Sequence, residues 1–125
     1  MNSKYKGDIA VGVAISYFLQ NEFEVCLPIG DKKDYDFLIE KSGKIKRIQV
    51  KYAGTYSRSQ KCIANLRVNG GNQSRFVCKK YSKDAFDLLF VYTEKGESYL
   101  LNWQSIQNVN QISLENKRYL RYKVV

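Results

Sequence analysis

The chain has 125 residues, a net charge of +9 and 44% hydrophobic residues, a composition typical of one globular domain with a buried core. It contains no histidine, which excludes Ser-His-Asp triads, Cys-His pairs and histidine zinc sites. There is no apolar signal segment and no apolar run near 18 residues, so we expect a cytoplasmic protein with a single domain over residues 1–125.

The positive charge is concentrated in the middle of the chain. From Lys41 to Lys83 there are twelve Lys or Arg residues and no Asp or Glu, whereas the remainder carries nine basic and twelve acidic residues. Such a block beside polar loops that contain aromatic residues indicates a polyanion binder, and nucleic acid is the commonest such partner. A generic basic surface is the alternative.

The chain begins with a predicted helix over residues 8–20. Ile9 and Val13, with either Phe18 or Tyr17, are spaced for one buried face, and Asp8 is a typical N-cap residue. This pattern predicts a helix with one face buried against the rest of the domain.

Strands follow the helix. Residues 23–28 predict a short strand that ends at the only proline. Residues 35–40 and 45–52 are rich in β-branched and aromatic residues, and the Ser-Gly pair between them is a tight-turn signal, so these two segments predict a hairpin.

The hairpin brings together residues with complementary chemistry. If its loop has two residues, Asp36 lies opposite Gln49, and Lys51 follows on the same face, while the apolar residues point to the other side. Asp36 and the Gln49 carbonyl oxygen suit a hard cation such as Mg²⁺, and Lys51 is placed to stabilise a phosphate. The hairpin therefore predicts a phosphodiester-cleaving site. The same alternation is also typical of the solvent-exposed face of any sheet, and a one-residue change in the loop would flip the register.

A polar loop and a second hairpin come next. Residues 62–69 alternate between apolar and polar, and the glycine-rich residues 70–75 predict a turn, so we expect a two-stranded β-ribbon. Such a ribbon fits a DNA major groove, where Arg pairs with guanine and Asn or Gln with adenine; an ordinary exposed hairpin is the alternative. The candidate DNA-binding residues are Lys46, Arg58, Lys61, Arg67, Asn69, Asn72, Gln73 and Arg75.

The last third predicts a buried strand over residues 87–93, a returning strand over 98–103 and a weak helix near 104–108. The segment 114–125 gives no clear assignment. A helix followed by several antiparallel strands and a short helical tail predicts an α+β fold.

Four short segments resemble the PD-(D/E)XK nuclease superfamily and, within it, the I-Ssp type of homing endonuclease encoded in group I introns. They are residues 6–9 (Lys-Gly-Asp-Ile), 27–30 (Leu-Pro-Ile-Gly), 35–36 (Tyr-Asp) and 48–51 (Ile-Gln-Val-Lys). The resemblance implies an N-terminal helix packed on a mixed, mainly antiparallel sheet, with a β-ribbon extension.

The resemblance also implies roles for residues. Asp36 and Gln49 would be metal ligands for Mg²⁺, and Lys51 would be the lysine of the motif. Gln49 stands where the family usually has an acid, and its neutral amide supplies an oxygen ligand without charge, so we expect weaker metal binding. Relatives commonly carry a glutamate in the first helix at the position of Val11. We hypothesise that this chain lacks one active-site carboxylate and binds DNA while cleaving it poorly.

One subunit of this kind carries one site, so the resemblance implies a homo-oligomer, a dimer or tetramer, on a pseudo-palindromic DNA target. The sequence therefore leaves three functions open. The first is a Mg²⁺-dependent, site-specific double-strand DNA endonuclease of the homing type. The second is a Holliday junction resolvase or restriction-type nuclease on the same scaffold. The third is a non-catalytic DNA- or RNA-binding protein.

Overall fold

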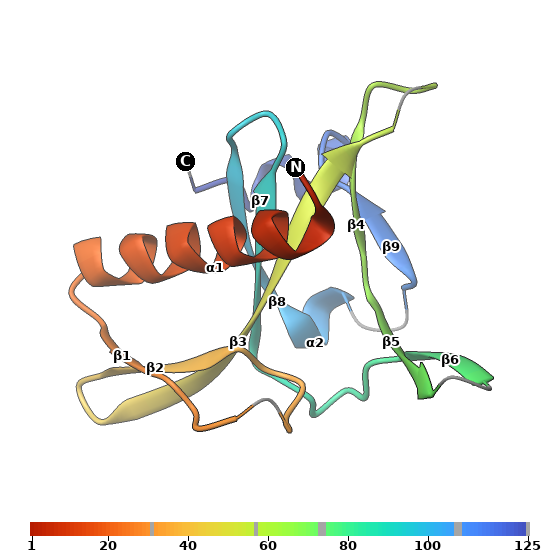
Figure 1. Ribbon diagram of the computed structural model, residues 1–125. Helices are drawn as coiled ribbons and strands as arrows, with labels where there is room; N and C mark the ends of the chain where they lie inside the picture. The colour runs from red at the N-terminus through yellow and green to blue at the C-terminus, as the bar shows by residue number, and fades with distance from the viewer. Residues whose placement is uncertain (31, 57, 73–74, 107–108, 125) are drawn as a thin grey trace.

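The computed structural model describes residues 1–125 except 31, 57, 73–74, 107–108 and 125, and for residues 67–72 and 75–80 it describes the backbone (Figure 1). Helix α1 (Ser3–Gln20) lies across a seven-stranded sheet. The sheet contains β1 (Glu24–Cys26), β2 (Phe37–Lys41), β3 (Lys44–Thr55), β4 (Cys62–Asn65), β7 (Leu88–Thr93), β8 (Ser98–Asn102) and β9 (Gln111–Ser113). A two-stranded ribbon extends from the sheet after strand β4. The other elements are β5 (Arg67–Asn72) and β6 (Arg75–Lys80) of the ribbon, and the short helices α2 (Trp103–Ile106) and α3 (Lys117–Leu120).

The sheet is mainly antiparallel, as predicted for an α+β fold. Its order is β1-β2-β3-β4-β9, with β7 parallel to β3 and β8 antiparallel to β7. The long strand β3 is thus the central element, because β2, β4 and β7 all pair with it. In the part of the chain that the structure describes, no helix is both long enough and apolar enough to cross a membrane.

Helix α1 begins earlier than predicted. The side-chain oxygen of Asn2 accepts hydrogen bonds from the backbone nitrogens of Lys4 (3.0 Å) and Tyr5 (3.1 Å), so Asn2 is the N-cap, and the prediction of Asp8 in that role is wrong. The first turn is polar and carries no apolar periodicity, so the sequence pattern does not show where the helix starts.

The buried face of α1 also differs from the predicted one. Ala10, Ala14 and Phe18 are at most 1% exposed, whereas Ile9 is 40% exposed and Val13 is half-buried. Small side chains let the helix lie close to the sheet. The cluster beneath α1 is formed by Ala10, Ala14, Phe18, Phe37, Ile39, Ile48, Val50 and Phe90, and we call it the α1 cluster.

The α1 cluster confirms the predicted alternation of the hairpin. Its β2 and β3 members are the apolar residues that were expected to point away from Asp36, Gln49 and Lys51. The Phe18 ring packs against those of Phe37 and Phe90, with centroids 6.0 and 6.1 Å apart. A second cluster, built around Phe86, Leu101 and Trp103, fills the space between the sheet and α2 and α3.

The strand predicted over residues 62–69 is interrupted. Cys62, Ala64 and Leu66 are buried as the alternation predicts, but β4 ends at Asn65, and the Leu66 backbone nitrogen donates to the Asn110 carbonyl oxygen (2.8 Å). The chain then leaves the sheet as the β5-β6 ribbon, shown in green in Figure 1. Residues 70–72 belong to β5, so the turn is shorter than predicted.

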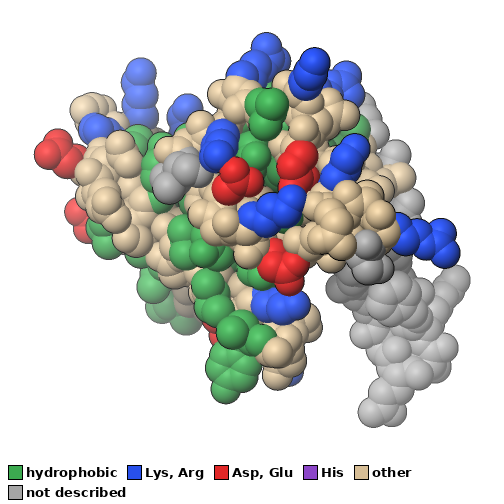
Figure 2. All heavy atoms as spheres, turned by 90° about the horizontal axis from the view of Figure 1, so that it is seen from above, with side chains coloured by type: hydrophobic (Ala, Val, Ile, Leu, Met, Phe, Trp, Pro, Cys, Tyr) green, Lys and Arg blue, Asp and Glu red, His purple; other side chains and the backbone are tan. Residues whose placement is uncertain are grey.

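The side chain of Glu115, in the segment before α3, connects the start of β4 to the turn between β7 and β8. Both carboxylate oxygens of Glu115 accept from the Cys62 backbone nitrogen (3.1 and 2.9 Å), and Oε1 also accepts from the Lys95 ammonium (3.0 Å). Burial acts to raise the pKa of Glu115, but the Lys95 charge and the Cys62 amide outweigh it and lower that pKa. Figure 2 shows that acidic side chains on the upper face of the molecule stand among basic ones.

The Glu115 contacts predict a dependence of stability on pH. A carboxylate whose pKa is lower in the folded than in the unfolded chain stabilises the fold above its ordinary pKa of 4.5 and loses that contribution as the pH falls through the folded pKa. Denaturant unfolding of the wild type and of Glu115→Gln should therefore show the largest difference in unfolding free energy at neutral pH, and a smaller difference in acid. A difference independent of pH would contradict this assignment.

Candidate active site

The central strand β3 passes an opening in the sheet. On one edge, β2 pairs with β3 as far as the Phe37–Ile48 pair, and β4 pairs with it only at Gly54 and Thr55. Between these points, over residues 49–53, no described strand pairs with that edge, although β7 pairs with the other. We call this stretch the β3 gap. Backbone groups of β3 at the gap are available to side chains.

The hairpin turn fixes what faces the gap. Ser42 and Gly43 have φ angles of 54° and 79°, the left-handed values that a two-residue type I′ turn requires. The predicted register is confirmed, because Phe37 pairs with Ile48. Asp36 therefore lies at the point where β2 leaves β3, and its backbone nitrogen donates to the Ile48 carbonyl oxygen (2.7 Å).

Two side-chain oxygens meet at one backbone nitrogen in the gap. The Val50 nitrogen lies 2.6 Å from Asp36 Oδ2 and 3.0 Å from Gln49 Oε1, and both oxygens accept from it. The carboxylate and the amide oxygen thus lie beside each other, as the hairpin register predicts. Burial raises the pKa of Asp36, although the Val50 amide and the Lys51 charge oppose that rise.

The orientation of the Gln49 amide is set by its other end. Its Nε2 donates to the Asp34 carbonyl oxygen at 2.5 Å, which turns Oε1 toward Val50 and Asp36. Gln49 is only 8% exposed. A carboxylate at this position would place an oxygen next to the Asp34 carbonyl oxygen, and two acceptors repel each other. The amide instead donates to Asp34 through its nitrogen and accepts from Val50 through its oxygen. The local structure therefore accounts for a glutamine at a position where the family resemblance implies an acid.

Lys51 lies on the same side of β3 and faces an aromatic ring. Its ammonium nitrogen is 5.0 Å from the centroid of the Tyr81 ring. Burial lowers the pKa of Lys51, and the negative charges of Asp36 and Asp34 oppose that change. Burial also raises the pKa of Tyr81, and the same two carboxylates add to the rise.

The structure thus adds two residues that sequence reasoning missed. Asp34 stands two positions before Asp36 in an exposed loop, and Tyr81 follows β6, 30 positions after Lys51. No motif marks either one. The proximity of a second acid to Asp36 was the only available signal for Asp34, and Tyr81 carried none because only the tertiary fold places it beside Lys51.

The oxygen donors of the gap fit a hard divalent cation. Asp36 offers a carboxylate and Gln49 an amide oxygen, both already aligned by Val50, and oxygen ligands are those that Mg²⁺ prefers. Among the described residues, no group of three or more Asp, Glu, His or Cys side chains is arranged to hold a metal ion. The donor set therefore fits a cation with few charged ligands, which favours weak binding.

The remaining predicted residues do not gather at the gap. Val11 is half-buried against the α1 cluster. Lys46 is exposed on β3 toward the hairpin turn, and Arg58 and Lys61 are exposed between β3 and β4. On the ribbon, Arg67, Asn69 and Asn72 belong to β5 and Arg75 to β6, while Gln73 lies outside the described residues.

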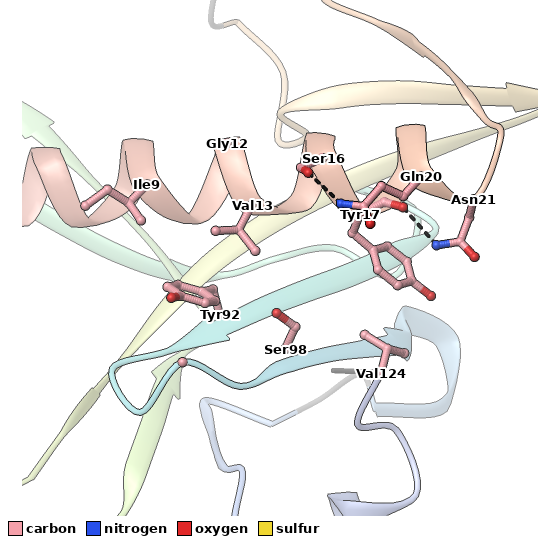
Figure 3. A pocket seen from close by; sticks show the side chains of 11 residues that line it. Ile9, Gly12, Val13, Ser16, Tyr17, Gln20, Asn21, Tyr92, Ser98 and Val124 are labelled. Atoms are coloured by element: carbon pink, nitrogen blue, oxygen red, sulfur yellow. Dashed lines mark hydrogen bonds between the residues drawn. The ribbon is translucent and has the colours of Figure 1, made fainter.

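A separate groove of about 760 Å³ lies between α1 and the β7–β8 hairpin (Figure 3). Val13 and Tyr17 of α1 line it on one side, and Tyr92, Ser98 and Val124 on the other. None of its lining residues is acidic or basic, so this groove offers no charged group to a metal ion or a phosphate.

Comparison with known proteins identifies the family. The sequence model of the PD-(D/E)XK endonuclease family matches residues 1–121. The solved structure of a bacterial homing endonuclease, I-Ssp6803I, superposes with a TM-score of 0.85 at 26% identity, over 98% of this chain and 89% of that one. No curated protein matches the chain by sequence. Because the family match extends over almost the whole chain, this protein belongs to the PD-(D/E)XK endonuclease family.

Proposed function

We propose that this chain is a Mg²⁺-dependent, site-specific double-strand DNA endonuclease of the homing type. The observation that carries the proposal is the meeting of the Asp36 and Gln49 oxygens at the Val50 amide, next to Lys51 in the β3 gap. Its support from outside the chain is the family match and the likeness to a bacterial homing endonuclease.

Asp36 and Gln49 are the residues proposed to hold the cation. When bound, Mg²⁺ would polarise the phosphate and lower the pKa of the attacking water. A cation would also favour the ionised form of Asp36, whose pKa burial raises. The Val50 and Asp34 backbone groups fix both ligands before metal or DNA arrives, so little ordering is required on binding.

Lys51 is proposed to act on the phosphate. Negative charge builds on the phosphate oxygens as the water attacks, and an ammonium that is already in place stabilises that charge without reorganisation. Lys51 is half-buried, so its charge is screened less than that of an exposed lysine. No described residue forms a hydrogen bond or an ion pair with its ammonium, whose three N–H groups stay available to a phosphate.

DNA recognition is assigned to the basic middle of the chain. The ribbon separates from the sheet after Leu66 and returns at Tyr81, so its backbone projects as a two-stranded unit of the kind that fits a major groove. We assign base contacts to its Arg and Asn residues and phosphate contacts to Lys46, Arg58 and Lys61, which are exposed.

Two copies are required for a double-strand cut. Each chain contains one β3 gap among its described residues, and the two strands of DNA present their phosphates in opposite directions. We therefore propose a homo-oligomer with two-fold symmetry, a dimer or a tetramer, on a pseudo-palindromic site.

One observation favours a second function, a DNA-binding protein without catalysis. Among the described residues no cluster of three or more acidic, histidine or cysteine side chains is placed to hold a metal ion, and Val11 is apolar where the family resemblance implies an acid. A nuclease with weak metal binding and a pure binding protein differ in whether Mg²⁺ produces any cut at all.

The two functions separate in a cleavage assay. The chain is incubated with Mg²⁺ and a plasmid library that carries candidate intron-insertion sites, and free DNA ends are sequenced. We expect ends at defined positions that disappear with EDTA. Tight binding to the same DNA without any new ends, in the wild type and in Val11→Glu, would overturn the proposal and leave the binding protein.

A further inference from the structure

Tyr81 stands where the ribbon rejoins the core. Strand β6 ends at Lys80, and the Tyr81 ring packs edge-to-face on Phe86 and Trp103, with centroids 5.2 and 6.1 Å apart. Phe86 and Trp103 are each 1% exposed, and the Trp103 indole nitrogen donates to the Ser82 carbonyl oxygen at 2.9 Å. The buried aromatic cluster thus fixes both the Tyr81 ring and the backbone beside it.

The Tyr81 ring also contacts Lys51. The ammonium nitrogen of Lys51 lies 5.0 Å from the ring centroid, within the range of a cation–π interaction. The Lys51 ammonium has no hydrogen-bond or ion-pair partner among the described residues, and the negative charges of Asp36 and Asp34 act on it without direct contact, so the Tyr81 ring is the contact that restrains it. An aromatic face restrains a cation without occupying its N–H groups, which leaves them free for a phosphate.

We infer that Tyr81 is a positioning residue that holds the Lys51 ammonium in the β3 gap and connects it to the β5-β6 ribbon. The inference rests on the proposed nuclease function, in which Lys51 acts on the phosphate. Tyr81 directly follows β6 of the ribbon, which is proposed to read DNA, and its ring contacts Lys51, which is proposed to act on the phosphate. This one side chain therefore connects DNA recognition with cleavage.

The contact has a spectroscopic signature that does not depend on activity. A proton above an aromatic ring resonates upfield, so we expect the ε-methylene signal of Lys51 in the full chain to lie upfield of the other lysines in a ¹H–¹³C spectrum. Tyr81→Phe should keep this shift and Tyr81→Leu should remove it. Tyr122→Leu is the matched control, because Tyr122 packs on the same apolar cluster and its ring faces Arg121 instead. An unchanged Lys51 signal in Tyr81→Leu would overturn the inference.

Cleavage kinetics test the consequence. At saturating DNA and Mg²⁺, we expect Tyr81→Leu to slow cleavage roughly tenfold with an unchanged Kd for DNA, and Tyr81→Phe to restore the rate. If Lys51→Ala stops cleavage but Tyr81→Leu cuts as fast as Tyr122→Leu, the positioning role is wrong and the proposed function stands. If neither the wild type nor Val11→Glu cuts DNA, the proposed function fails. If both the wild type and Lys51→Ala cut equally well, the proposed role of Lys51 fails while the nuclease function stands. In either case the NMR shift still decides whether the Tyr81 contact exists.

Discussion

Replacement of Lys51 by alanine should reduce DNA cleavage by about a thousandfold while DNA affinity changes little. The ammonium is half-buried in the β3 gap and has the negative charges of Asp36 and Asp34 near it. Its removal takes away a charge that matters most in the transition state, so the rate falls much more than the affinity. Single-turnover cleavage and binding, measured in parallel over a range of salt concentrations, give both quantities.

A matched control and a clear alternative accompany this experiment. Lys44→Ala removes an exposed lysine from the other end of the same strand and should leave the cleavage rate unchanged. A pure DNA-binding protein would respond differently, because loss of Lys51 would then only remove one phosphate contact and reduce the salt slope by about one unit. Equal cleavage by the Lys51 and Lys44 variants would contradict the proposed role of Lys51.

Replacement of Val11 by glutamate should increase cleavage by about 10–100-fold at low Mg²⁺ concentration. The expected cause is an added carboxylate, since metal affinity rises with the number of charged ligands. Val11 is half-buried against the α1 cluster and not in the gap, so this prediction rests on the family resemblance, and the longer glutamate side chain has to extend past Val50, the cluster member whose amide aligns Asp36 and Gln49. The measurement is the cleavage rate as a function of Mg²⁺ concentration for the two chains.

The control for Val11→Glu lies on the same helix. Val13 is also a half-buried valine packed on the α1 cluster, but it lines the uncharged groove of Figure 3. Val13→Glu carries the same cost of burying a charge and should produce no gain in cleavage. A wild type that already cuts its target at the rate of Val11→Glu would contradict the hypothesis of a missing carboxylate.

The hairpin could be predicted from sequence because all of its determinants are local. The Ser-Gly pair specifies a tight turn, and the alternation of apolar residues specifies which face is buried, so the register that aligns Asp36 with Gln49 follows from residues close together in the chain. The break after Asn65 had no such signal. The apolar alternation continues through Leu66 as the chain leaves the sheet, and periodicity does not reveal which strand is the partner.

The rest of the candidate site depends on tertiary packing. Helix α1 has apolar residues on several sides, so its buried face could not be chosen from spacing, and Ile9 proved more exposed than Ala10. Tyr81 reaches Lys51 only because the ribbon returns to the sheet beside Phe86 and Trp103. Contacts of this kind join segments far apart in the chain and leave no local pattern.

The central claim is that the β3 gap binds a divalent cation through Asp36. Mn²⁺ broadens the NMR signals of nearby nuclei even when it binds weakly, so a titration with small amounts of Mn²⁺ locates the site without knowledge of the DNA target. We expect selective broadening of the Val50 and Lys51 amide signals, its loss in Asp36→Asn, and its persistence in Asp8→Asn, which alters an exposed acid on α1. Broadening that occurs elsewhere, or that survives in Asp36→Asn, would contradict the claim.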